Sequence, residues 1–151
     1  MSQENVEVVS RWAHQLMENM EAHRGDPRSY GAELRDGELD PATQAAVDLL
    51  HPEISWTSPL GEVYEGKLEC VRFAGQLLDA SQSYSLSLRD LQDLARDQVL
   101  AEYDVDMRGA ASGIGARFII AVVFTVREGL ISRMVEYRSR GEALRAVGLE
   151  E

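Results

Sequence analysis

The chain has 151 residues, of which 44% are hydrophobic and 27% charged, and this size and composition are typical of one soluble globular domain. With 15 basic and 26 acidic side chains its formal net charge is -11, so it would repel nucleic acid, and we expect no nucleic-acid partner. The longest apolar run, Phe118 to Val126, is far shorter than the roughly 20 residues of a membrane-spanning helix. We therefore expect no membrane partner. The absence of a secretory pattern at the start and a lone cysteine, Cys70, favour a cytoplasmic location.

The first half of the chain predicts helices separated by one long loop. Apolar residues at helical spacing predict helices over Asn5 to His23, Ala42 to Leu50, Lys67 to Ser81 and, near the end, Glu142 to Val147. The stretch from Arg24 to Asp40 contains three glycines and a proline without a sustained period, and we expect an extended loop at about residues 25–41. Asp40-Pro41 supplies a cap and a first-turn proline for the second helix, which is expected to end at His51-Pro52.

The second half predicts strands joined by tight turns. A short strand is expected over Ile54 to Ser58, and four longer ones over Tyr84 to Leu94, Gln98 to Arg108, Ala116 to Arg127 and Leu130 to Arg140. Short connections make antiparallel neighbours, so these four strands predict a meander. The fold class that follows is α+β, with the helices covering one face of an antiparallel sheet.

One predicted strand is apolar on both faces. In Arg117 to Val126, Phe118, Ile120, Val122 and Phe124 point one way, and Ile119, Ala121 and Val123 point the other way. Because the predicted helices hardly suffice for two faces, the outer sheet face is expected to pack on a second copy of the chain. The sequence thus predicts a homodimer through the outer face.

Several segments together resemble a known family. These are Asn-Val-Glu-Val-Val-Ser-Arg-Trp at Asn5 to Trp12, Leu-Leu-His-Pro-Glu-Ile-Ser-Trp at Leu49 to Trp56, Gly-Glu-Val-Tyr-Glu-Gly at Gly61 to Gly66, and the hairpin from Phe124 to Tyr137. In this order they resemble the SnoaL-like branch of the nuclear-transport-factor-2-like, or ketosteroid-isomerase-like, superfamily. The resemblance implies a single SnoaL-like domain over residues 1–151, with a cone-shaped curved sheet wrapped around the N-terminal helices and a pocket between them. Pro27 to Asp40 is longer than the usual connection in these proteins.

The catalytic positions of the steroid isomerases can be located in this chain by the resemblance, but they hold other residue types. The carboxylate base of those enzymes precedes a Pro-x-Gly turn, where this chain has Ser58. Their oxyanion-binding tyrosine corresponds to Trp12, and their protonated aspartate to Val122. Ketosteroid isomerase chemistry is therefore not expected.

A second branch, the limonene-epoxide-hydrolase-like proteins, uses two carboxylates joined through an arginine. The carboxylate of their last strand matches Glu136. Their arginine and second aspartate fall near Tyr103 and Val105, so activation of water by a carboxylate pair is not expected either.

Glu136 is the candidate catalytic residue. Strand alternation puts it on one face with Met134 and Arg138, the face that the resemblance assigns to the pocket. Partial desolvation there would raise the pKa of the carboxyl group toward the range of a general acid or base. Alternatively, Arg138 pairs with it and Glu136 is structural.

The remaining candidate residues are those of a ligand pocket. An aromatic group could line it or form ordinary core. The predicted lining is Trp12, Trp56, Ser58, Phe73, Tyr103, Phe118, Val122, Met134 and Arg138. Ser58 lacks a histidine at suitable spacing and is expected to bond its own turn. The three histidines form no metal-binding pattern, so we expect no metal and no cofactor.

Two functional hypotheses remain open. In the first, the protein binds a small hydrophobic metabolite in an internal pocket and acts on it as an isomerase or hydrolase through Glu136. In the second, it is a non-catalytic dimeric interaction or binding module whose pocket is filled by side chains. An empty cavity of a few hundred Å³ would favour the first hypothesis.

Overall fold

The computed structural model describes residues 2–149. It has the predicted α+β architecture. The helices are α1 (Ser2–Ala22), α2 (Pro27–Arg35), α3 (Pro41–Val47), α4 (Lys67–Asp79) and α5 (Arg140–Ala146). The strands are β1 (Leu50–Thr57), β2 (Val63–Glu65), β3 (Ser81–Asp93), β4 (Gln98–Gly109), β5 (Gly115–Arg127) and β6 (Leu130–Tyr137). Over the described part of the chain, no helix has the length and apolar character needed to cross a membrane.

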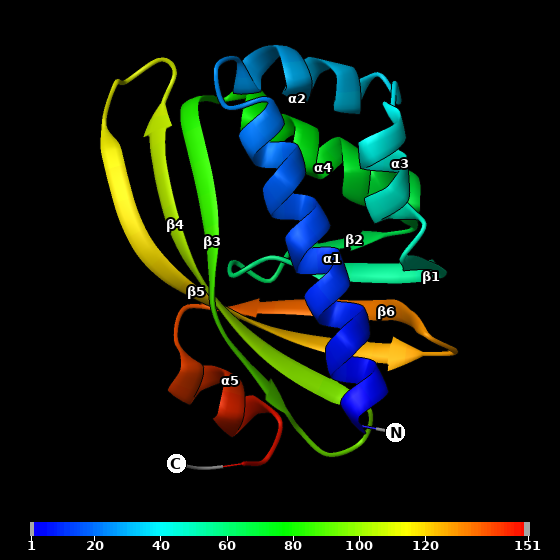
Figure 1. Cartoon of the computed structure of the whole chain (residues 1–151). Helices are drawn as coiled ribbons and strands as arrows, with labels where there is room; N and C mark the ends of the chain where they lie inside the picture. The colour runs from blue at the N-terminus through cyan, green and yellow to red at the C-terminus, as the bar shows by residue number, and fades with distance from the viewer. Residues whose placement is uncertain (1, 150–151) are drawn as a thin grey trace.

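The six strands form one curved sheet in the order β2-β1-β6-β5-β4-β3. Strands β3 to β6 are the predicted antiparallel meander, which the pairing confirms. β1 joins β6 in parallel and β2 in antiparallel pairing. Figure 1 shows α1 lying across the sheet, while α2 and α4 lie together beside the upper part of β3 and above β1 and β2. The sheet is therefore mostly antiparallel and is covered on one face by the N-terminal helices.

The main core lies between α1 and the sheet face that we call the inner face. Its fully buried members include Val9 and Ala13 of α1 and Val99, Phe124 and Ile131 of the sheet. The amphipathic stripe predicted for the first helix supplies the α1 side of this core. Alternation along β4 and β5 then sends the intervening side chains to the opposite, outer face.

The outer face is covered in part by the chain itself. Leu100, Ala121 and Val123 on this face pack against Ala143 and Leu144 of α5, the short helix drawn below the sheet in Figure 1. The second apolar face of β5, which predicted a partner copy, thus finds some of its cover within one chain. Farther along the strand, however, Ile119 is 38% exposed.

The extended loop predicted at about residues 25–41 is wrong over most of its length, because Pro27–Arg35 forms α2. Asp26 caps this helix by accepting a hydrogen bond from the backbone N–H of Ser29 at 3.1 Å, and Pro27 occupies the first turn. Tyr30 and Leu34 are buried on the side that faces α4. Asp26-Pro27 repeats the signal that correctly predicted the start of α3 at Asp40-Pro41.

One smaller prediction around β1 is also wrong. His51-Pro52 was expected to end a helix, but α3 ends at Val47 and β1 already begins at Leu50. Pro52 is tolerated because the pairing of β1 with β6 shifts register between Leu50 and Ser55, and a proline fits where a ladder is interrupted. The three-residue strand β2 was not predicted.

Candidate functional site

A cavity of about 340 Å³ lies between the inner face of the sheet and helices α1 to α4. Its lining is mainly apolar. The helices contribute Trp12, Leu16, Met20, Leu34, Val71, Phe73, Ala74 and Leu77, and the sheet contributes Leu86, Val105, Phe118, Ile120, Val122, Phe124 and Met134, among others. The size and the apolar character are those of sites that hold small molecules.

Most of the residues predicted for the pocket do line this cavity. They are Trp12, Trp56, Phe73, Tyr103, Phe118, Val122, Met134 and Glu136. They come from α1, β1, α4, β4, β5 and β6, so the fold brings together side chains that lie far apart in the sequence. Trp56 and Phe73 also contact each other, edge to face, with ring centroids 4.8 Å apart.

Two predicted pocket residues lie elsewhere. The hydroxyl of Ser58 accepts hydrogen bonds from the backbone N–H groups of Leu60 and Glu62 at 3.3 and 3.2 Å, so it holds its own turn, as expected for a serine there. Arg138 follows the last residue of β6 and is exposed. Strand alternation no longer applies at that position, and no ion pair between Arg138 and Glu136 occurs among residues 2–149.

Glu136 is half-buried on the inner face of β6, opposite Val122 of β5. Burial raises the pKa of its carboxyl group to about 7, and the hydrogen bond that Oε1 accepts from the indole N–H of Trp56 acts in the opposite direction. Trp56 is placed for this contact because β1 runs parallel to β6, with Trp56 beside Met134. Near neutral pH the carboxyl group therefore exists in both its acidic and its basic form.

Tyr84 and Tyr103 line the cavity together with Glu136 and are affected by its charge. Burial, followed by the charge of Glu136, raises the pKa of Tyr84 to about 12 and raises the pKa of Tyr103 as well. Both phenols are therefore neutral at physiological pH. The Tyr103 hydroxyl is buried and has no hydrogen-bond partner among the described residues.

Comparisons with known proteins show the family and the fold of this chain. A model of the SnoaL-like domain matches residues 30–134, more than half of the chain. The chain belongs to the SnoaL-like domain family. No curated protein matches this SnoaL-like chain.

Solved structures show which fold this SnoaL-like chain shares. A nuclear-transport-factor-2-like protein from Anabaena variabilis ATCC 29413 is 19% identical with a TM-score of 0.66, and 92% of each chain is covered. A candidate polyketide cyclase from Xanthomonas campestris pv. campestris is 20% identical with a TM-score of 0.61, covering 97% of this chain and 98% of that one. A protein with a ketosteroid-isomerase-like fold from Catenulispora acidiphila DSM 44928, in complex with trimethylamine, is 15% identical with a TM-score of 0.61, covering 95% and 93%. At these identities the likeness establishes the fold and not the activity.

Part of the cavity lining comes from the segment that was predicted to be a loop. Tyr30 and Leu34 of α2 and Thr43 of α3 line the helical end of the cavity. The capping pair Asp26-Pro27 could have revealed this wall. Among the described lining residues, Glu136 is the one carboxylate and none is Lys, Arg or His. This composition gives no support to a metal site or to paired-carboxylate chemistry in the cavity.

Proposed function

We propose that this SnoaL-like protein binds a small, mainly apolar molecule in the cavity beneath α1 to α4. One observation carries the proposal: an apolar and aromatic space of about 340 Å³ contains a single half-buried carboxyl group, Glu136. Ligand sites commonly combine a large apolar area with a few convergent polar groups. The structural relative from Catenulispora acidiphila, which was crystallised with trimethylamine, also supports a role in small-molecule binding. The filled pocket of the competing hypothesis has no support from this geometry.

Glu136 is the group that we propose for acid or base chemistry on this ligand, in an isomerase or a hydrolase. Because burial raises its pKa to about 7, it can both accept and return a proton near neutral pH. The N–H of Trp56 fixes the orientation of one carboxylate oxygen and leaves the other for the ligand. The alternative role, a structural pair with Arg138, loses support because Arg138 is exposed beyond the end of β6.

The binding proposal is tested by native mass spectrometry on protein purified from its own cell extract. We expect a mass above that of the polypeptide that disappears on denaturation, and small-molecule analysis of the released material should then identify the compound. Protein that carries no compound, and that takes up none when incubated with an apolar extract of the same cells, would refute the binding proposal.

The catalytic part is tested with Glu136→Gln, which keeps the shape of the side chain and removes the titration. For a turned-over ligand, kcat should fall by at least about a hundredfold, the usual size of general acid or base catalysis, while binding changes little. Asp106→Asn is the matched control, because Asp106 lies on the outer face and pairs with Arg117 at 3.6 Å. Equal losses in kcat and in binding would argue against acid or base chemistry at Glu136.

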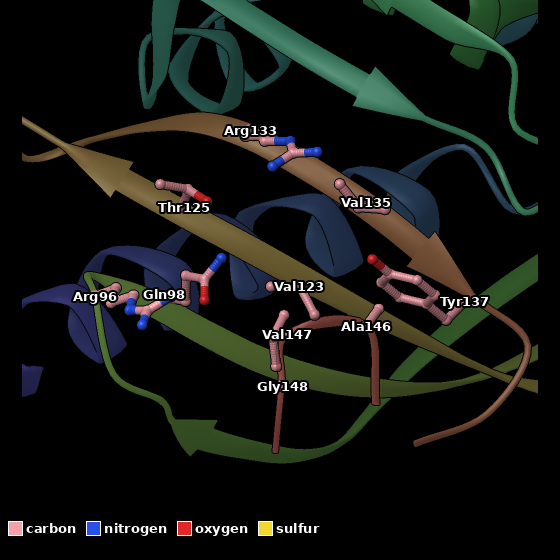
Figure 2. A pocket seen from close by; sticks show the side chains of 10 residues that line it. All are labelled: Arg96, Gln98, Val123, Thr125, Arg133, Val135, Tyr137, Ala146, Val147 and Gly148. Carbon is pink, nitrogen blue, oxygen red and sulfur yellow. The ribbon is translucent and has the colours of Figure 1, made fainter. Parts of the chain in front are cut away.

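The outer face supports the homodimer predicted from the sequence. A groove of about 430 Å³ lies on this face. Figure 2 shows that side chains of β4, β5 and β6 meet the end of α5 there. Val123, Val135, Tyr137 and Val147 give it an apolar part, which a second copy could cover. Light scattering after size exclusion should give twice the chain mass, and Val135→Asp should give the monomer mass. A monomeric wild-type protein would rule out the dimer.

We also propose a cytoplasmic location, which the presence of a single cysteine, Cys70, supports.

A further inference from the structure

The cavity opens to solvent at two of its lining residues. Among the described residues that line it, only Pro59 and Phe118 are exposed, and the others are buried or half-buried. Pro59 lies in the connection between β1 and β2 in Figure 1, and Phe118, which is 44% exposed, lies on β5. Residues that face both the cavity and the solvent mark the path between them. The entrance therefore lies between Pro59 and Phe118.

A compact turn forms the Pro59 side of this entrance. The backbone N–H of Ser58 donates to the carbonyl oxygen of Glu62 at 2.8 Å, and the N–H of Gly61 donates to the carbonyl oxygen of Ser58 at 2.9 Å. The Ser58 hydroxyl accepts two further hydrogen bonds from the backbone of this turn, and the proline ring fixes the φ angle of Pro59. Because these bonds join residues of the turn to one another, the turn holds Pro59 in place. Ser58, which was predicted for the pocket, therefore stabilises one side of its entrance.

A single exposed side chain forms the opposite side of the entrance. Phe118 is paired with Val105 of β4, and strand alternation directs it to the inner face together with Ile120. Exposed side chains change rotamer within picoseconds to nanoseconds, so the Phe118 ring can move while the turn stays in place. Ile119, the next residue, is also exposed but does not line the cavity. Strand β5 therefore places one exposed apolar side chain at the entrance and the next one on the other face.

The interior of the cavity is poorly suited to select among apolar molecules. Met20, Met107 and Met134 line it, and methionine side chains adapt to ligands of different shape. Apolar pockets in general distinguish weakly between similar ligands. An entrance bounded by a fixed turn and one aromatic ring is different, because it limits the width of the molecule that can pass.

We propose that Pro59 and Phe118 form the entrance to the cavity, and that this entrance selects ligands by width and admits narrow or flat apolar molecules. This inference rests on the proposed function, because it requires the cavity to be a ligand site. Phe118 then controls the rates at which a ligand enters and leaves. A side chain that blocks the path slows both steps by the same factor, whereas one that only contacts the bound ligand changes mainly the dissociation rate.

Stopped-flow fluorescence with N-phenyl-1-naphthylamine, a neutral probe that emits more strongly in apolar surroundings, tests the role of Phe118. Phe118→Ala should raise the association and the dissociation rate constants severalfold and by the same factor, so that the affinity changes little. Ile119→Ala is the matched control and should change neither rate, because Ile119 does not line the cavity. A loss of affinity that arises from faster dissociation alone would make Phe118 a contact of the bound ligand and overturn the proposal.

Selection by width is tested with two isomers, n-butylbenzene and tert-butylbenzene, which have the same atoms and differ in width. When one of them is mixed with wild-type protein together with the fluorescent probe, the early signal reports which molecule enters first. The linear isomer should delay the probe more than the branched isomer does, and Phe118→Ala should reduce this difference. Equal entry of the two isomers into the wild type would overturn the selection by width.

Chemical modification tests the position of the entrance independently. Phe118→Cys labelled with N-cyclohexylmaleimide should take up and release the probe more slowly than before labelling, and labelled Ile119→Cys should not. The native Cys70 is buried, and burial raises the pKa of its thiol to about 11, so it should not react at neutral pH. If the probe binds and the label at position 118 leaves its exchange unchanged, the cavity is a ligand site but its entrance lies elsewhere. If neither the probe nor the two isomers bind the wild type, the proposed function fails together with this inference.

Discussion

The two ends of the cavity differ in whether a buried tyrosine hydroxyl has a hydrogen-bond partner within the protein. At the helical end, where α1, α2 and α3 meet, polar groups find partners within the protein. The buried hydroxyl of Tyr30 lies 2.6 Å from the Oγ1 atom of Thr43, and the Tyr30 ring stacks on His23 with ring centroids 3.8 Å apart. At the sheet end, Tyr103 has no partner among residues 2–149, and Glu136 is bonded to Trp56. The buried tyrosine hydroxyl at the helical end is thus paired within the protein, and the one at the sheet end is not.

The carboxyl group of Asp40, which caps α3, and that of Glu136 in the cavity differ in their acidity. The hydrogen bond that Asp40 accepts from the backbone N–H of Thr43, with help from His23, holds the pKa of Asp40 below its ordinary value. Burial raises the pKa of Glu136 to about 7. The folded state thus favours the charged form of Asp40 and the neutral form of Glu136. Asp40 therefore adds stability that is lost toward acid pH, and Glu136 lowers stability toward neutral pH.

The largest expected effect is the pH dependence that Glu136 imposes on folding. Its pKa is about 7 in the folded state against an ordinary value of 4.5. Below the lower value both states are protonated, and Glu136 has no effect. Between the two values the unfolded state ionises first, so stability falls as pH rises, and above about pH 7 the full cost of about 3 kcal/mol is present. Urea unfolding of wild type and Glu136→Gln at about pH 5 and pH 8 measures this cost as the difference between the proteins.

Asp106→Asn controls for the general effect of removing a negative charge. Asp106 is on the outer face, so this variant should keep the pH dependence of the wild type. If Glu136→Gln also keeps it, Glu136 is solvated in the folded protein and the contrast between Asp40 and Glu136 disappears.

Close packing of the helical wall predicts the next largest effect. A Cβ atom on Gly31 of α2 would lie 2.5 Å from the backbone nitrogen of Asp79 and 2.6 Å from the carbonyl oxygen of Gly75 in α4. Although alanine is the better helix former by about 1 kcal/mol, α2 would have to move away from α4. We expect Gly31→Ala to lose about 2 kcal/mol of unfolding free energy, as measured by chemical denaturation.

Gly141→Ala in α5 provides the comparison for this loss. The nearest atom to an added Cβ there is the end of the Arg145 side chain at 3.3 Å, which can move. This variant should be as stable as wild type or more so. Equal stabilities of the two alanine variants would contradict a close contact between α2 and α4.

The sequence predicted the sheet end of the cavity well and the helical end poorly. Alternation along β4, β5 and β6 placed Tyr103, Val122 and Glu136 on one face, because a period of two leaves little freedom in a paired strand. It failed at Arg138, where the strand has already ended. The unmet hydroxyl of Tyr103 could not be predicted, since it depends on what the other elements fail to supply.

The wall formed by α2 was missed because glycine was interpreted as a breaker. Gly31 occurs inside the helix, where it lets two backbones approach, and Gly75 does the same on α4. A helix whose glycines serve tertiary packing has a weak local signal. The pair Asp26-Pro27, a cap followed by a first-turn proline, is the stronger local indication that a helix begins there. The packing of α5 on the outer face was not predicted either, because the sequence of a seven-residue helix does not indicate which face of the sheet it will contact.

The smallest expected effect separates the two tyrosines directly. Tyr30→Phe leaves the Thr43 hydroxyl, on a residue that is 6% exposed, without its partner at 2.6 Å, and should cost about 1 kcal/mol. In the Thr43→Val background the same substitution should cost clearly less, because no partner is left behind, so a double-mutant cycle by chemical denaturation should give a favourable coupling energy. Tyr103→Phe should cost nothing. If the two phenylalanine variants lose the same stability, the distinction between the paired tyrosine at the helical end and the unpaired one at the sheet end is wrong.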